Sequence, residues 1–126
     1  ILRQSIDDLQ KGCCKVKKDT LTDEEIENAV TWLKNSSDKS AKLKAERKYL
    51  EEYRKSLKAL LMKENVDMPI SAQEREAYAD PRYINHLKAL KIAIERDEKQ
   101  AFLRGACEAK IEAWRSMSAN IRAIKL

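Results

Sequence analysis

The chain has 126 residues with a formal net charge of +5, and 37% of its residues are charged. It contains only 2 glycines and 2 prolines, the residues that tight turns and β-hairpins require, so the composition excludes a fold of many short strands and indicates long helices. The 3 cysteines are too few, and odd in number, which excludes the disulfide framework of a small secreted protein and favours the reducing cytoplasm.

Residues 1–20 are predicted to be a poorly defined N-terminal segment, and residues 21–126 to be a single domain. Within the segment, Leu2, Ile6 and Leu9 follow helical spacing, but over too short a stretch to define an element. The adjacent cysteines Cys13 and Cys14 fit none of the expected elements.

A capping box at residues 22–25 predicts the start of the first helix of the domain, because it places a hydroxyl at the cap and a carboxylate three residues later. Ile26, Val30 and Leu33 then lie on one face of this helix. The helix ends near a polar cluster at residues 35–38, which is either a short loop or a new N-cap.

A second helix is predicted over residues 39–64. Its apolar residues follow a heptad-like spacing with Glu46 in the gap, which is typical of a seam that packs against another helix. The seam residues are Leu43, Leu50, Tyr53, Leu57 and Leu60, and Tyr49 and Leu61 widen it. Pro69 blocks continuation of this helix. A second capping box at residues 71–74 predicts a short helix through Ala79.

The longest predicted helix covers residues 80–124. Asp80 can cap its free N–H groups, and Pro81 lacks the N–H that would otherwise be unpaired there. Two apolar stripes follow, separated by a charged stretch: Ile84, Leu87, Leu90 and Ile94, then Leu103, Cys107, Trp114, Met117, Ile121 and Ile124. Gly105 is the weak point, costing about 1 kcal/mol relative to alanine. Such a helix would be roughly 65 Å long.

The predicted fold class is therefore all-α, a long antiparallel helical hairpin or coiled coil with a short helix in the connection. Two thin helices leave much apolar surface in water, so we expect a homo-oligomer. The residues expected at an oligomer or partner interface are Leu57, Leu60, Trp114, Met117 and Ile121. No apolar run approaches the roughly 20 residues of a membrane span, so no membrane partner is expected.

The sequence offers little catalytic chemistry, and we expect neither an enzyme nor a cofactor. The single histidine, His86, lacks the Glu-x-x-His spacing of a di-iron bundle, because Tyr83 stands at the glutamate position. The cysteines lack the short spacings of a zinc site. Acidic clusters at residues 23–27 and 95–98 fit helix starts and solvated faces better than metal ligation, so no metal site is predicted.

Positive charge is unevenly distributed: residues 39–63 hold nine Lys or Arg against three Glu, whereas residues 64–80 hold one Arg against five acids. A basic helical face can follow DNA phosphates, and aromatic residues beside cations, as at Trp114 and Tyr53, can stack on bases. The predicted contacts to single-stranded or duplex DNA are Lys42, Arg47, Lys48, Arg54, Lys55, Lys58, Arg115 and Arg122. The alternative is a lysine-rich surface that serves only solubility.

Two passages, residues 49–62 (YLEEYRKSLKALLM) and residues 111–122 (IEAWRSMSANIR), resemble small helical proteins encoded by bacteriophages and prophages. Genes of this family often lie near DNA recombination or replication functions. The resemblance implies a non-enzymatic phage accessory protein in the cytoplasm of the bacterial host, which contacts DNA or a recombination or replication protein. It carries no catalytic residue to this sequence. The alternative is a structural or adaptor protein that binds only protein partners.

Overall fold

The computed structural model describes residues 21–125. The predictions for residues 1–20, including Cys13 and Cys14, lie outside the described residues. The described part contains four helices and no strand: α2 (Asp23–Asn35), α3 (Ser37–Lys63), α4 (Ile70–Ala79) and α5 (Pro81–Lys125). The all-α fold class is therefore confirmed for this part of the chain.

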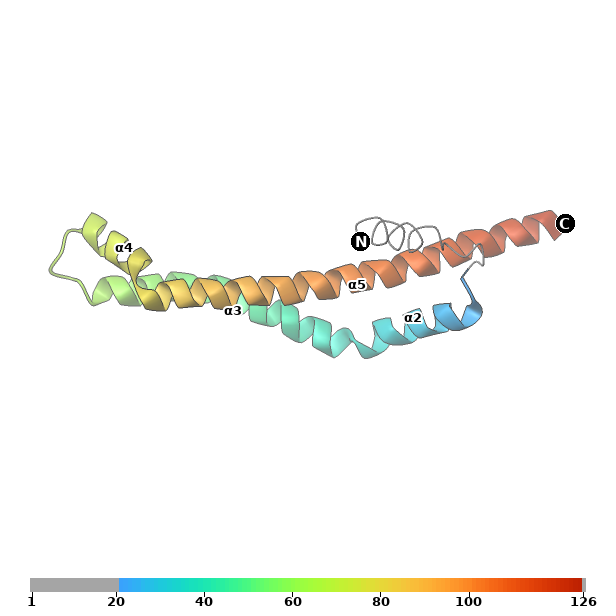
Figure 1. Ribbon diagram of the computed structural model, residues 1–126, viewed down its shortest axis with the longest axis horizontal. Coiled ribbons are helices and arrows are strands. Elements are labelled where there is room, and N and C mark those ends of the chain that lie inside the picture. The colour runs from blue at the N-terminus through green and yellow to red at the C-terminus, as the bar shows by residue number, and fades with distance from the viewer. Residues whose placement is uncertain (1–20, 126) are drawn as a thin grey trace, which may run out of the picture.

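α5 has 45 residues and is the element against which each of the other helices packs (Figure 1). At 1.5 Å per residue it is about 67 Å long. α3 lies antiparallel along its first half, since Ser40 pairs with Gln100 at one end and Glu64 pairs with Arg82 at the other. α2 lies along the second half, and α4 folds back beside the turn that joins α3 to α5.

Local capping signals set two of the helix boundaries. The Thr22 hydroxyl accepts a hydrogen bond of 3.2 Å from the backbone N–H of Glu25, as the capping box predicts. Asp80 Oδ1 accepts one of 2.8 Å from the N–H of Arg82, and Pro81 is the first residue of α5. The polar cluster at residues 35–38 does not form a loop. Only Ser36 separates α2 from α3, and it is the N-cap residue of α3, without a side-chain cap bond.

The prediction that Ser71 caps the short helix is wrong. α4 begins at Ile70 with Pro69 at the N-cap, and no side chain caps it. The ring of Pro69 fixes a backbone conformation that starts the helix before Ser71 is reached, and its carbonyl accepts a bond of 2.9 Å from the N–H of Gln73. The side chain of Gln73 donates a bond of 2.7 Å to the carbonyl of Met68, which ties α4 to the preceding loop.

The best-buried cluster of the described residues lies beside the turn. Leu61 of α3, Ala77 of α4 and Tyr83 of α5 pack together, with Leu57 and Met62 against them. Ala77 is 1% exposed and Leu61 3% exposed, so the side chains at which the three helices meet are shielded from solvent. This cluster holds α4 against the α3–α5 layer.

Arg82 adds a polar connection at the same end. Its guanidinium donates two bonds to Glu64, of 2.9 and 2.6 Å, and further bonds to Asp80. These bonds hold the pKa of both carboxyl groups below their usual values. Because both pKa values are lowered by folding, the pairs stabilise the fold at neutral pH and stop doing so as pH falls through the folded pKa values.

The buried face of α5 differs from the stripe that the sequence predicts. Its buried residues, Tyr83, His86, Leu90, Ala93 and Gln100, follow a 3-4-3-7 spacing, whereas Ile84 and Leu87 are 42% and 39% exposed. Two polar side chains occupy this seam because each has a partner on α3. His86 Nε2 lies 2.7 Å from the Leu50 carbonyl, and Gln100 Nε2 donates a bond of 3.0 Å to the Ser40 hydroxyl.

None of the helices within residues 21–125 has the length and hydrophobicity that crossing a bilayer demands.

α5 continues through Gly105, and a Cβ atom at this position would meet nothing within 4 Å. We therefore expect Gly105→Ala to raise the free energy of unfolding by about 1 kcal/mol, because it removes the entropic cost of a helical glycine. Urea denaturation measures the change. Ala106→Gly, at the adjacent exposed position, is the matched control and should lower stability by a similar amount. A less stable Gly105→Ala protein would contradict a continuous α5.

Candidate nucleic-acid interface

Arg47, a predicted nucleic-acid contact, lies within an ion cluster between α3 and α5. Its guanidinium is 2.7 Å from Glu98, 3.1 Å from Asp97 and 3.1 Å from Glu51. Hydrogen bonds to Glu98, then Glu51 and Asp97, raise the pKa of Arg47 above its usual value. Arg47 therefore connects the two helices. Since three carboxylates already neutralise its guanidinium, it would attract a phosphate only weakly.

Three other predicted contacts come together in a hollow between α3 and α4. Arg54, Lys55 and Lys58 line a hollow of about 360 Å³ with Tyr78 and Tyr83, which we call the turn-end hollow. The three cations come from two successive turns of α3, and the tyrosines come from α4 and the start of α5. The packing of the buried cluster beside the turn brings them together.

Within the turn-end hollow the cations differ in how far they are neutralised. Lys58 Nζ lies 4.7 Å from the centre of the Tyr78 ring and 3.5 Å from Glu74. Contact with Tyr78, and then the charge of Glu74, raises the pKa of Lys58 and keeps it protonated. Lys55 is a largely exposed partner of Glu52, and no ion pair among residues 21–125 involves Arg54.

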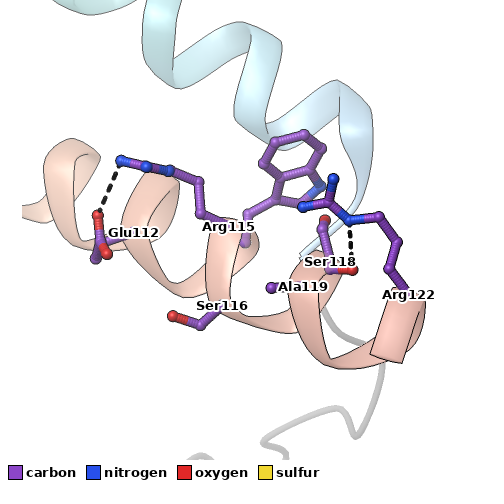
Figure 2. A pocket seen from close by; sticks show the side chains of 7 residues that line it. Glu112, Arg115, Ser116, Ser118, Ala119 and Arg122 are labelled. Carbon is purple, nitrogen blue, oxygen red and sulfur yellow. Dashed lines mark hydrogen bonds and ion pairs between the residues drawn. The ribbon is translucent and has the colours of Figure 1, made fainter. Parts of the chain in front are cut away.

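The two remaining arginines of the prediction lie at the other end of the molecule. Arg115 and Arg122 line an open hollow of about 690 Å³ near the end of α5, together with Trp114 (Figure 2). Arg115 reaches toward Glu112, 3.6 Å away, and Arg122 folds back to donate a bond of 3.4 Å to the Ser118 carbonyl. We call this the C-terminal hollow.

Trp114 is positioned by α2. Its indole Nε1 donates a bond of 3.1 Å to Asp23, the first residue of α2. The ring is therefore held between the two helices, and its exposed part borders the C-terminal hollow. The last two predicted cations, Lys42 and Lys48, are exposed on α3 and line neither hollow.

Family models, curated proteins and solved structures were compared with the chain. None of them matches. Within residues 21–125 there is also no group of three or more His, Cys, Asp or Glu side chains that could hold a metal ion. The geometry of the described residues therefore carries the functional argument.

The predicted interface residues fall in two places. Leu57 and Leu60 lie near the turn, where Leu57 packs on the buried cluster and Leu60 is 54% exposed. Trp114, Met117 and Ile121 lie toward the end of α5, where the first two are half-buried and Ile121 is 51% exposed.

Sequence reasoning missed Tyr78 and Tyr83. It placed aromatic–cation pairs at Tyr53 and Trp114, but Tyr53 stacks on Tyr49, with ring centres 5.9 Å apart, outside the turn-end hollow. Tyr78 lies twenty residues beyond Lys58, so only the geometry of the turn reveals their contact. The one sequence signal for this contact was the short helix predicted in the connection between the two long helices.

Proposed function

We propose that this is a non-enzymatic phage or prophage accessory protein that self-associates and contacts DNA or a DNA recombination or replication protein in the bacterial host cytoplasm. The observation that carries the DNA contact is the turn-end hollow, with three cations and two tyrosines around one space. Cations beside aromatic rings are the combination with which proteins hold phosphates and stack bases.

Single-stranded DNA suits the turn-end hollow better than a duplex. Tyr78 is 48% exposed, so part of its ring is available to stack on an unpaired base. Arg54 and Lys55 at the rim would contact the flanking phosphates, where charge-assisted bonds are the stronger kind. A duplex offers the same phosphates but keeps its bases stacked on each other.

The C-terminal hollow provides a second set of the same residue types, with Trp114 as the aromatic ring. Arg115 lies 32 residues beyond Tyr83 on one continuous helix, so the two hollows are about 48 Å apart. Arg54 of the turn-end hollow lies in the first passage that resembles phage proteins, and Arg122 of the C-terminal hollow lies in the second. The phage assignment rests on that resemblance.

Self-association is supported by the large apolar side chains that the described helices leave exposed to water. Beyond the contact of Trp114 with α2, Ile121 and Ile124 of α5 are 51% and 83% exposed. We expect a second copy to cover this end of α5.

The test is fluorescence anisotropy of labelled single-stranded and duplex DNA at about 50 and 200 mM salt. Replacing Arg54, Lys55 and Lys58 together by glutamine should lower the affinity for single-stranded DNA at least tenfold at the lower salt. The slope of log affinity against log salt should become shallower by about 1.4, because Arg54 and Lys55 are the two proposed phosphate contacts and each single-strand contact contributes about 0.7.

The matched control replaces three exposed lysines of α5 that line neither hollow, Lys88, Lys91 and Lys110, by glutamine. It removes the same net charge and should change affinity much less. Equal losses in the two triple variants would mean that only net charge matters. Absence of binding by the unaltered protein at about 50 mM salt would overturn the DNA contact.

The second candidate is an adaptor that binds only proteins. It is favoured by the exposure of large apolar side chains along α3 and α5, including Leu60 at 54% and Ile92 at 50%. If the protein is such an adaptor, replacing Arg54, Lys55 and Lys58 by glutamine would not change its affinity for the protein partner.

A further inference from the structure

An apolar groove runs along one side of the α3–α5 layer. Three open hollows of about 550, 320 and 470 Å³ follow one another along α3, from Leu60 to Leu50 to Leu43. The second and third share Leu43 and Arg96, so they are continuous. We call these three hollows together the α3 groove.

The α3 groove has the periodicity of a helix-binding surface. The residues that α3 contributes to its floor are Leu43, Glu46, Leu50, Tyr53, Leu57 and Leu60, at alternating spacings of three and four. This is the heptad seam that the sequence predicts for packing against a helix. The seam is only partly covered by α5. Leu57 packs on the cluster that contains Tyr83, and the Tyr53 ring lies 5.5 Å from the His86 ring. Ile92 and Leu103 of α5, which border the groove, are still 50% and 44% exposed. A helix of about 24 residues would span its length.

The rim of the α3 groove is basic. Five cations line it, Lys39, Lys63, Arg82, Arg96 and Lys99, against Glu64 at the rim and Glu46 on the floor. Glu64 is already bonded to Arg82. No ion pair within residues 21–125 involves the other four cations. An apolar floor with unneutralised cations at its edges calls for an occupant that supplies leucine-like side chains and carboxylates together.

We infer that the α3 groove binds an acidic amphipathic helix of a partner protein. This inference rests on the proposed function, because it gives the chemistry of the protein partner that the proposed function names. The apolar stripe of the partner helix lies on the seam, and its Glu and Asp residues pair with the cations of the rim.

Charge decides against a second copy as the occupant. The groove carries a net charge of +3, so docking two copies groove to groove would bring like charges together around a desolvated seam. An antiparallel pairing centred on the groove would bring the basic end at Lys39, Arg96 and Lys99 against Lys63 of the other copy. Self-association is therefore assigned to the end of α5 and not to this groove.

The probe is a labelled 24-residue peptide with leucine at the heptad seam positions and glutamate beside them, used at nanomolar concentration to keep it monomeric. A second peptide carries lysine in place of glutamate. Anisotropy titration with the full chain should give saturable binding of the acidic peptide, at least tenfold tighter than that of the basic peptide.

Two pairs of substitutions locate the site. Leu60→Glu with Ile92→Glu places charge on the floor, and both positions are exposed enough for the fold to persist. Lys39→Glu with Lys99→Glu reverses the rim. Each pair should lower the affinity for the acidic peptide at least tenfold. The affinity for single-stranded DNA should stay within twofold of that of the unaltered protein. Phe102→Glu, at a position 74% exposed outside the groove, is the matched control and should change neither affinity.

Equal binding of the two peptides, no binding of the acidic peptide, or binding insensitive to the floor variant would overturn the inference. So would a dimer in solution that becomes a monomer with Leu60→Glu and Ile92→Glu, since the groove would then hold a second copy. Failure of DNA binding alone refutes the DNA contact and leaves this result standing, because the turn-end hollow and the α3 groove share no cation.

Discussion

Leu61→Ala is expected to lower the free energy of unfolding by about 3 kcal/mol. Leu61 is 3% exposed and fills the space between α3, α4 and α5, where Ala77 and Tyr83 are its neighbours. Truncation removes buried methyl groups and leaves a cavity that neighbouring side chains refill only in part. Three helices share this contact, so the loss should appear as one cooperative shift of the urea midpoint.

Leu60→Ala is the control for this prediction, because it makes the same chemical change at the preceding residue. Leu60 is 54% exposed, so its truncation should cost less than about 1 kcal/mol. Losses of similar size in the two variants would mean that the cluster beside the turn is not packed as the structure shows. α4 would then lack the contact that holds it in place.

Ile26→Asp is expected to detach and unfold α2 while the rest of the described fold persists. Ile26 and Ala29 are the only buried residues of this 13-residue helix, so its packing on α5 depends on very few side chains. A carboxylate at this contact is unpaired and costly to bury. Once detached, a helix of this length is not stable in water. Roughly one-seventh of the helical circular dichroism signal should be lost.

Hydrogen exchange distinguishes this local event from global unfolding. Protection should be lost throughout α2 and retained around Leu61 and Leu90. Val30→Asp is the matched control, since Val30 lies on the same helix but is 50% exposed, and this variant should keep the α2 signal. Simultaneous loss of protection in every helix would show that α2 is part of the same cooperative unit as α3 and α5.

Helix boundaries were predictable where the signal is local. Thr22 and the Asp80-Pro81 pair act through backbone groups within three residues, and both do in the structure what their positions predict. Ser71 has the same local pattern but fails as a cap, because Pro69 begins the helix earlier. Competing signals only two residues apart cannot be ranked from pattern alone.

The buried faces were harder to predict than the helices. On α5 the apolar stripe through Ile84 and Leu87 is exposed, and a seam containing His86 and Gln100 is buried. Hydrophobic periodicity assigns polar residues to solvent, but here each polar side chain has a hydrogen-bond partner across the interface. Such pairing depends on the register between two helices, which one sequence does not reveal.

The candidate site shows the same division. The cations Arg54, Lys55 and Lys58 were predictable because they lie on adjacent turns of a single basic helix. The tyrosines beside them were not, because Tyr78 reaches Lys58 only through the turn and the packing of α4. Arg47 resembles its basic neighbours in sequence, yet it is surrounded by carboxylates of which two come from α5.

The arrangement of the helices along α5 also determines the order in which their contacts can form during synthesis. Arg82 pairs with Glu64 across 18 residues, but Trp114 pairs with Asp23 across 91. At typical translation rates a ribosome needs about 5 to 18 s to make the chain between Asp23 and Trp114. During that time the apolar face of α2 has been made and has no α5 to cover it, whereas the turn cluster can form much sooner. In a nascent chain of this protein, Ile26 and Ala29 therefore stay uncovered until the second half of α5 has been made.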